Sequence, residues 1–382
     1  EEYRKIQDLV AKFVADELLP LESIVCEREA QQGSGYLVRE EWSAIDSRAR
    51  ELGLFGLDAP ESVGGSDLSN LALTCVNEEI GYSAVYYELP PNSANLRILL
   101  EEGSDIQRDK YLKPLASGEM STAIMVSEPG AGGDPSGMKT SAQQDGDVWT
   151  INGRKIWISN ARDANFYFVF AVTGKNERGK SEVTAFIVDK DTPGITIERD
   201  VSMIAGWKTY EVAFDDCRVG TNSILGKVGS GWTPLQKRLE SRRLEIAAWS
   251  IGAARRALDM MVEYAPSRVT FGAALADRQS IQWWITEART QIHACRLMCQ
   301  HAAWSLDNGL DVSNEVSLLK VHATEMAGTV IDHAMQVYGA MGVSKETPLY
   351  LLAQQQRLAR IYEGPSEVHI SRVARNIFAG KF

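Results

Sequence analysis

The sequence has no uninterrupted apolar run of about 18 residues, which is the length that a membrane-spanning helix needs. It also lacks a basic-then-apolar leader and any lipidation motif. We therefore expect no membrane span or anchor. The sequence opens at Glu1 without a methionine. We expect a cytoplasmic protein of a bacterium or, if a leader was removed, a protein of the mitochondrial matrix.

Cysteine and histidine are scarce, with five of each in 382 residues. An odd number of cysteines in a long chain argues against a disulfide framework and favours a reducing compartment. Cys295 and Cys299 are not spaced as Cys-x-x-Cys, and both fall on an apolar seam of helical period. We interpret them as helix core rather than as a thiol pair. The histidines form no compact ligand spacing, so we expect no metal.

Positive charge is also in short supply. The 40 Lys and Arg residues face 51 Asp and Glu residues, which gives a formal net charge of −11. A chain of this charge does not suit a phosphate backbone, so we expect no nucleic-acid partner. Local arginine clusters can still bind small anions.

The period of the apolar residues changes twice along the chain, which predicts three domains. Residues 1–118 have helical spacing and form an N-terminal helical domain. Residues 119–228 contain short strand-like runs and form a middle β domain, antiparallel, with Asn152-Gly153 as a hairpin turn. Residues 229–382 return to the helical period and form a four-helix-type bundle. The predicted fold class is α+β, mainly α.

Glu363 lies on a predicted turn near the C-terminus. Gly364-Pro365 ends one helical pattern and allows another to begin. Ile361 and Tyr362 are apolar, so if the turn points inward, burial raises the pKa of Glu363 toward the working pH, as a general base needs. The alternative is a surface carboxylate near a helix start, favoured by the helix dipole. The residues alone favour this alternative.

Residues 128–134 are rich in glycine but do not open a helix within a βαβ unit, so they do not fit a dinucleotide fingerprint. They predict either a loop between strands whose backbone N–H groups can approach an anion, or a plain turn. Trp157 and Ser159 share one face of a predicted strand. They form either a platform for a flat ligand or a half-buried strand face.

Two groups of basic residues could serve anionic ligands. Arg242 and Arg243 follow Lys237 and Arg238 at the start of the first bundle helix. Such a group is usually a solvated face, yet Arg243 lies close to the apolar stripe, which leaves a role in a pocket open. Residues 268–272 lie between two long helices and supply a guanidinium, a hydroxyl and a ring. This loop could hold a phosphate, although structural capping is the favoured alternative.

In their identity and order these motifs resemble those of the acyl-CoA dehydrogenases, over nearly the whole chain and in the same three-part layout. The resemblance implies an FAD-dependent enzyme with an acyl-CoA substrate, an electron-transfer flavoprotein as partner and a homotetramer built from dimers. It also favours the interpretation of Glu363 as a general base over that of a surface carboxylate, because Glu363 matches the family's catalytic base. The motifs that carry it are residues 60–65, 127–134, 152–160, 268–272, 336–339 and 362–364.

The resemblance also implies roles for individual residues. Those that match residues around the flavin ring are Met125, Val126, Ser127, Gly132, Gly133, Trp157, Ile158 and Ser159. Those that match residues at the diphosphate and adenosine end of FAD, held across a subunit interface, are Arg268, Thr270, Phe271, Gln279, Gln336, Val337, Gly339, Ala340, Pro365 and Glu367. Those that match residues beside the acyl-CoA are Gly133, Glu240, Arg242, Arg243, Tyr362 and Gly364.

The family's reaction has a simple physical account. The α proton of a thioester is weakly acidic, so the carbonyl oxygen must be held by hydrogen-bond donors while the proton leaves. The resemblance implies that these donors are the backbone N–H of Glu363 and a ribityl hydroxyl of FAD. It implies that Glu363 takes the α proton while a hydride passes from the β carbon to the flavin, which gives a trans-2-enoyl-CoA.

Five positions depart from the family pattern. Arg242 stands where some members carry an alternative base or a small polar residue. Its guanidinium would lower the pKa of the base or receive a carboxylate or other polar group of the acyl chain, and we favour the second. Trp249 stands where small residues are common, so it reshapes or shortens the acyl cavity. Gly133 replaces a frequent serine, and Pro365 and Glu367 replace a frequent threonine and glutamine.

Two other functions are compatible with this fold. One is a flavin oxidase, monooxygenase or desulfinase-like relative, and the other is a non-catalytic scaffold. Retention of Glu363 favours dehydrogenation over both, because a scaffold has no need of a base.

Overall fold

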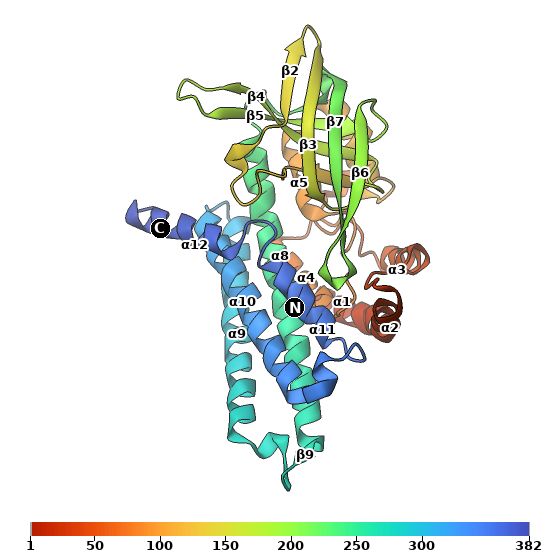
Figure 1. Ribbon diagram of the computed structural model, residues 1–382, viewed down its shortest axis with the longest axis vertical. Helices are drawn as coiled ribbons and strands as arrows, with labels where there is room; N and C mark the ends of the chain where they lie inside the picture. The colour runs from red at the N-terminus through yellow and green to blue at the C-terminus, as the bar shows by residue number, and fades with distance from the viewer. Residues whose placement is uncertain (1, 382) are drawn as a thin grey trace.

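A helical body with a β domain at one end makes up the structure, a computed structural model that describes residues 2–381 (Figure 1). The order of helices, strands and helices confirms the predicted fold class. Short π and 3₁₀ turns join several of the N-terminal helices. These helices are α1 (Glu2–Phe13), α2 (Glu22–Gln32), α3 (Arg39–Glu51), α4 (Asn70–Ile80), α5 (Ser93–Glu102), α6 (Asp105–Gln107) and α7 (Lys113–Ala116).

The β domain is one twisted sheet with the order β6-β7-β3-β2-β4-β5-β8, and β1 pairs with β4. Most ladders are antiparallel, as predicted, but β1 runs parallel to β4. No tight hairpin sets the direction of β1, since a long loop separates it from β2. The strands are β1 (Thr122–Met125), β2 (Ser141–Asp145), β3 (Val148–Ile158), β4 (Phe166–Lys175), β5 (Ser181–Asp189), β6 (Ile195–Ser202), β7 (Lys208–Gly220) and β8 (Ile224–Leu225).

The predicted hairpin turn at Asn152-Gly153 is wrong, because both residues lie inside β3. The register against β7 shifts there, as in a β-bulge. The Asn152 side chain accepts a hydrogen bond from the backbone N–H of Asp216 at 2.8 Å. A Cβ on Gly153 would lie 2.5 Å from Thr140 Oγ1, so the glycine permits a close approach rather than a turn.

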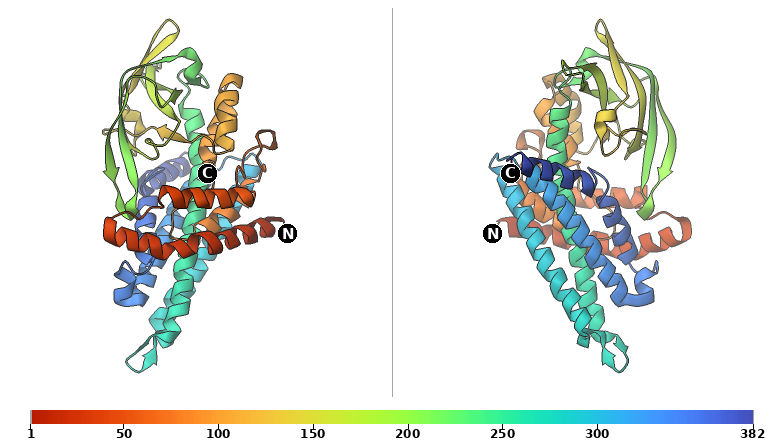
Figure 2. Two further views of the ribbon diagram at one scale, coloured as in Figure 1. Left: turned by 90° about the vertical axis from the view of Figure 1, so that its right-hand side faces the viewer. Right: turned by 60° about the vertical axis from the view of Figure 1, so that its left-hand side comes forward.

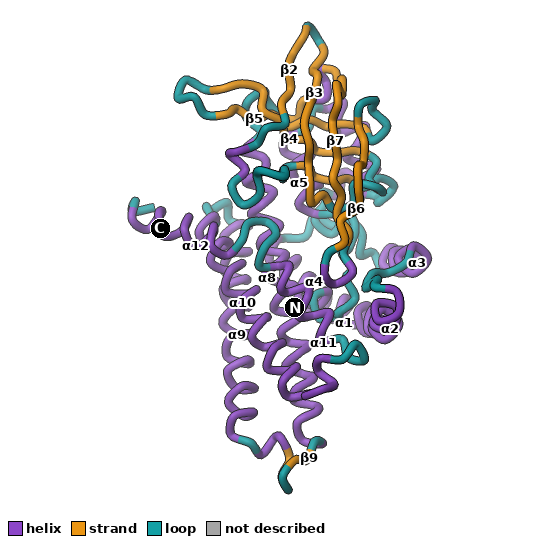
Figure 3. The backbone as a smooth tube through the Cα atoms, in the orientation of Figure 1, coloured by secondary structure: helices purple, strands orange, loops and turns teal. Residues whose placement is uncertain are grey.

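The C-terminal part is a bundle of long helices with a small hairpin at the end farthest from the β domain, and α1 and α2 lie across it (Figures 2 and 3). Cys295 and Cys299 are buried, free thiols in its core, as predicted. Its elements are α8 (Trp232–Ser267), β9 (Val269–Thr270), β10 (Ala273–Ala274), α9 (Gln279–Asp307), α10 (Ser313–Tyr338), α11 (Leu349–Ala359) and α12 (Ser366–Phe378).

A close contact between α4 and α8 positions the site. A Cβ on Gly81 would lie 2.4 Å from the backbone oxygen of Trp249, and one on Gly252 would lie 2.1 Å from that of Glu78. Only glycine fits at either place. The backbone after α4 therefore lies directly against α8 beside Trp249.

None of the helices among residues 2–381 is both long enough and apolar enough to span a membrane. Within the same residues, no group of three or more His, Cys, Asp or Glu side chains is arranged to hold a metal ion.

Candidate functional site

The turn that carries Glu363 lies between α11 and α12, as predicted. Glu363 has φ 55° and Gly364 has φ 98°, so both residues adopt left-handed backbone conformations. Such a conformation is costly for a glutamate and persists only where the surroundings hold it.

Buried side chains hold the carbonyl groups of this turn. Arg243 Nε donates to the backbone oxygen of Glu363 at 3.1 Å, and His369 Nε2 lies 3.3 Å from the same atom. Lys320 Nζ donates to the backbone oxygen of Gly364 at 2.7 Å, and its side chain is fully buried. Burial, followed by the charge of Arg243, lowers the pKa of His369 to about 4, so the ring is neutral and donates from Nε2.

We expect Lys320→Met to lower the rate of substrate oxidation by roughly 10- to 100-fold with little change in substrate affinity. The methionine fills the space but leaves the Gly364 carbonyl without its donor, and small displacements of a reacting group cost about this much. Rapid-reaction kinetics separate the two quantities. Lys113→Met, which changes a lysine on the surface, is the control. An equal loss of rate in this variant would show that the loss does not depend on the contact between Lys320 and Gly364.

The side chain of Glu363 is paired with Arg238. Arg238 Nη1 lies 2.8 Å from Glu363 Oε1, and the side chains are only 5% and 19% exposed. Burial raises the pKa of Glu363, but the charge and hydrogen bond of Arg238, with Arg242 and Arg243, outweigh it and hold that pKa below its ordinary value. The predicted rise in pKa is therefore wrong, because the prediction counted burial and omitted this arginine.

Of the four basic residues grouped near the start of α8, three are buried, so the solvated-face interpretation is wrong for Arg238, Arg242 and Arg243. Arg242 forms a bidentate pair with Glu88, at 2.8 and 3.1 Å, and also contacts Glu245 at 2.7 Å. Burial raises the pKa of Glu245 to about 7 despite Arg242. Two carboxylates already meet this guanidinium, which argues against a third one from a substrate.

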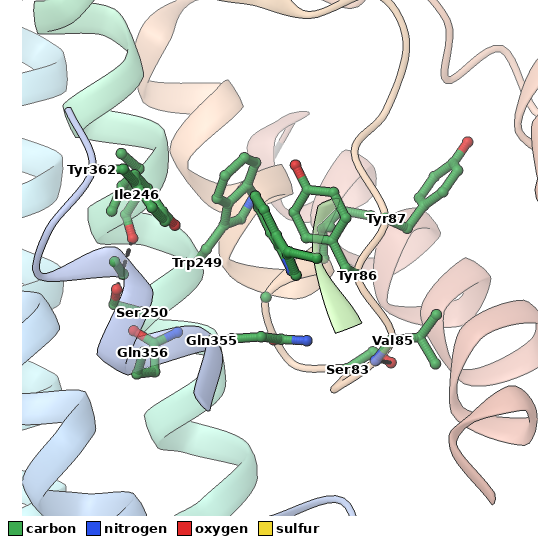
Figure 4. A pocket seen from close by; sticks show the side chains of 14 residues that line it. Ser83, Val85, Tyr86, Tyr87, Ile246, Trp249, Ser250, Gln355, Gln356 and Tyr362 are labelled. Carbon is green, nitrogen blue, oxygen red and sulfur yellow. Dashed lines mark hydrogen bonds between the residues drawn. The ribbon is translucent and has the colours of Figure 1, made fainter. Parts of the chain in front are cut away.

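An aromatic pocket lies beside the Glu363 turn, and its empty space, open solvent included, measures about 490 Å³ (Figure 4). Its walls come from the loop after α4, the turn between β6 and β7, α8 and α11. The Tyr86 and Trp207 rings lie 4.4 Å apart, and Trp207 stacks on Tyr362 at 6.2 Å. Sequence reasoning missed Tyr86 and Trp207, since nothing local links them to Glu363. The aromatic lining residues are Tyr86, Tyr87, Trp207, Trp249 and Tyr362.

The residues matched to the flavin ring come from β1, the loop after it and the end of β3, and the backbone N–H of Ile156 joins β3 to that loop at Ser127. Trp157 is 50% exposed with φ 63°, where the β3 register is irregular, and Ser159 is also exposed. The loop after β1 runs beside them, and a Cβ on Gly132 would meet no atom within 4 Å. An exposed flat ring beside open backbone fits the flavin of FAD. Met125 and Ile158 are buried, so they can offer only backbone groups to it.

The residues matched to the adenosine end form two groups. Pro365 lies beside the flavin loop, since a Cβ on Gly133 would be 3.4 Å from its Cγ, and the exposed Glu367 follows it. The other group lies at the far end of the bundle, around the hairpin labelled β9 (Figure 1). There Phe271 is fully exposed, while the Val337 side chain is buried. This group contains Arg268, Thr270, Phe271, Gln279, Gln336, Val337, Gly339 and Ala340.

Both the sequence and the structure resemble those of known proteins. Family models of the acyl-CoA dehydrogenase N-terminal, middle and C-terminal domains match residues 1–119, 123–217 and 229–378. The (R)-benzylsuccinyl-CoA dehydrogenase of Thauera aromatica is 40% identical, covering 99% of this chain and 95% of that protein. A 3-(aryl)acrylate reductase of Clostridium sporogenes is 32% identical, covering 87% and 89%. The structure of butyryl-CoA dehydrogenase from Megasphaera elsdenii matches with TM-score 0.89 and 30% identity, covering 98% of each chain.

Proposed function

Since the chain belongs to the acyl-CoA dehydrogenase family, whose members are FAD-dependent oxidoreductases of CoA thioesters, we propose that it oxidises an aryl-substituted acyl-CoA to the trans-2-enoyl-CoA. Glu363 is the base in this proposal. The observation that carries it is the position of the Glu363 carboxylate on a cation-held turn beside a pocket of aromatic side chains.

The chain's own residues account for removal of the α proton. The Glu363 carboxylate accepts it, and Lys320 and Arg243 keep the turn in place while it does so. The backbone N–H of Glu363 is the chain's own donor to the thioester oxygen in this proposal, and it favours the negative charge that develops there. The aromatic walls limit the access of water to the site, which strengthens these interactions. FAD, when bound, supplies the hydride acceptor.

The aryl preference rests on the pocket and on two relatives. Aromatic pairs contribute about 0.5–1.5 kcal/mol beyond burial of their area, so a lining of five aromatic side chains suits an aryl group. The names of both relatives, (R)-benzylsuccinyl-CoA dehydrogenase and 3-(aryl)acrylate reductase, contain an aryl group. Neither observation depends on the other.

Anaerobic titration of the FAD-loaded protein tests the proposal. Aryl-substituted acyl-CoAs should bleach the oxidised-flavin band, while straight-chain acyl-CoAs of equal length should do so much more slowly. Fast bleaching by straight chains and none by aryl substrates would reject the aryl preference. Bleaching by no thioester in the panel would reject dehydrogenation of acyl-CoA.

We expect Trp249→Ala to lower kcat/KM for an aryl acyl-CoA by about tenfold and to raise it for longer straight chains. The ring forms one wall of the pocket, Arg242 stacks over it at 4.5 Å, and its Nε1 donates to Asn77 at 2.8 Å. Its removal deletes an aromatic contact and adds space. Trp249→Phe is the control, because it keeps a ring and should retain the preference. Unchanged selectivity in both variants would exclude Trp249 from the acyl site.

The separation of the two groups of FAD-matching residues supports a shared cofactor site. The hairpin of β9 and β10 lies far from β3, the strand that contains Trp157, in the same chain (Figure 1). We propose that a second copy supplies the hairpin, in a homotetramer built from dimers. We also propose an electron-transfer flavoprotein as the acceptor, which the family resemblance implies. Faster reoxidation of the reduced protein by oxygen than by that flavoprotein would favour an oxidase.

A further inference from the structure

Arg238 is a buried arginine at the centre of the site that the family resemblance does not assign. Its side chain is 5% exposed. Nε donates to Asn95 Oδ1 at 3.0 Å, and Nη1 donates to Glu363 Oε1 at 2.8 Å. The guanidinium therefore holds the carboxylate that must act as base. An ion-paired carboxylate is a weaker base than a free one in the same place.

Two further basic side chains hold the turn of Glu363 beside this pair. Arg243 and the fully buried Lys320 contact the carbonyl groups of the Glu363 turn. Arg243 Nη1 is also buried and has no hydrogen-bond partner among the described residues. A buried guanidinium donor without a partner is costly, so the site is suited to a further acceptor.

Other charged groups nearby do not fill this role. Glu88 and Glu245 are both engaged by Arg242. Burial and the charge of Asp311 raise the pKa of Glu240, and the charges of Arg372 and Arg243 oppose that shift. Among the described carboxylates, Glu363 is the one that contacts Arg238. A second anion at Arg238 must therefore come from a ligand.

We propose that Arg238 binds a second carboxylate on the acyl group of the substrate, and that this carboxylate replaces Glu363 on the guanidinium and frees the base. The proposal rests on the proposed function and names its substrate class, an aryl acyl-CoA that carries a carboxylate. A succinyl chain, as in the name of the Thauera aromatica relative, is short enough to hold that carboxylate close to the α carbon. The guanidinium fork suits exchange between two carboxylates.

The exchange of carboxylates on Arg238 links binding of the substrate to the basicity of Glu363. While Arg238 is paired with the substrate, the Glu363 carboxylate remains buried but loses its closest counter-ion, so its affinity for a proton rises. A neutral acyl group gives no such exchange and leaves the base paired. Discrimination then arises in the chemical step as well as in binding.

Two thioesters that differ in one group test this. Benzylsuccinyl-CoA carries the carboxylate, and 2-benzylbutanoyl-CoA has a methyl group in its place. We expect the wild-type protein to prefer the acid by about 100-fold in the rate of anaerobic flavin reduction divided by Kd. Arg238→Met should remove about 100-fold from the acid and at most about fivefold from the neutral thioester. For the neutral thioester, the acid limb of the pH profile should move to higher pH, because Glu363 loses its partner.

Lys237→Met is the matched control on the same helix. Lys237 is exposed and pairs with Glu101 at the surface, so both rates should stay unchanged. Arg238→Lys should keep part of the preference, since it retains the charge but not the fork. FAD content and Tm identify a variant that fails to fold.

Equal loss on both thioesters in Arg238→Met would overturn the inference and leave Arg238 with a structural role. Equal rates for both thioesters in the wild type would also overturn it. If the wild type oxidised neither thioester, the proposed function would fail separately. Calorimetric binding of the two thioesters to wild type and Arg238→Met would then still decide whether Arg238 selects the carboxylate.

Discussion

Replacement of Glu363 by glutamine should lower the rate of flavin reduction by an acyl-CoA by about 10³- to 10⁴-fold, with substrate binding largely retained. Glutamine matches the shape of glutamate but cannot accept the α proton, and general base catalysis is worth up to about this factor. The backbone hydrogen bonds from Arg243 and Lys320 to the turn do not involve the replaced group. Stopped-flow absorbance of the FAD-loaded variant measures the rate.

Glu363→Asp provides the control for this experiment. It keeps the base but shortens its reach, so it should retain more activity than the glutamine variant. Equilibrium binding of a non-oxidisable acyl-CoA analogue checks that the pocket is intact. If Glu363→Gln kept more than a tenth of the wild-type rate, another carboxylate would have to be the base, and Glu240 would be tested next because burial raises its pKa.

Replacement of Lys155 by methionine should lower the free energy of unfolding by about 3–5 kcal/mol, because it leaves Glu128 buried without a counter-ion. Lys155 Nζ lies 2.9 Å from Glu128 Oε1, and the two side chains are 0% and 5% exposed. Burial lowers the pKa of Lys155 to about 8 even though Glu128 opposes the shift. Chemical denaturation of the FAD-loaded protein, with matched cofactor content, measures the change.

The same pair holds the loop at the predicted flavin site. Glu128 accepts hydrogen bonds from the backbone N–H groups of Lys139 and Thr140, at 2.7 and 2.9 Å, and Lys155 donates to the backbone oxygen of Val126 at 3.1 Å. We therefore expect Lys155→Met also to weaken FAD binding, which fluorescence of released flavin would detect. The buried pair of Glu128 and Lys155 thus stabilises the loop of residues 127–134, which the resemblance matches to the flavin.

Two further variants make the stability experiment decisive. Glu128→Gln combined with Lys155→Met removes both charges and should recover part of the lost stability, because no unpaired ion remains. Lys237→Met breaks an exposed pair with Glu101 and should cost less than about 1 kcal/mol. A loss in Lys155→Met no larger than that in Lys237→Met would contradict the argument from burial.

Local patterns in the sequence were sufficient for several features. The helical period placed Cys295 and Cys299 in a core, and Gly364-Pro365 predicted the turn of Glu363. Both depend on interactions between residues near in sequence, which periodicity and proline geometry report. Asn152-Gly153 is the counterexample, because contacts with Asp216 and Thr140 override the turn preference of that dipeptide.

The chemistry of the site depends on residues far apart in the chain. Glu363 and Arg238 are separated by 125 positions, and Arg242 and Glu88 by 154. No local pattern pairs them, since packing of the loop after α4 and of the Glu363 turn against α8 brings them together. The sequence by itself determined the family, the three-part fold and the identity of the candidate base. Only the tertiary structure decided the direction in which the pKa of that base shifts and the lining of the aromatic pocket, because both depend on which side chains lie within a few ångströms.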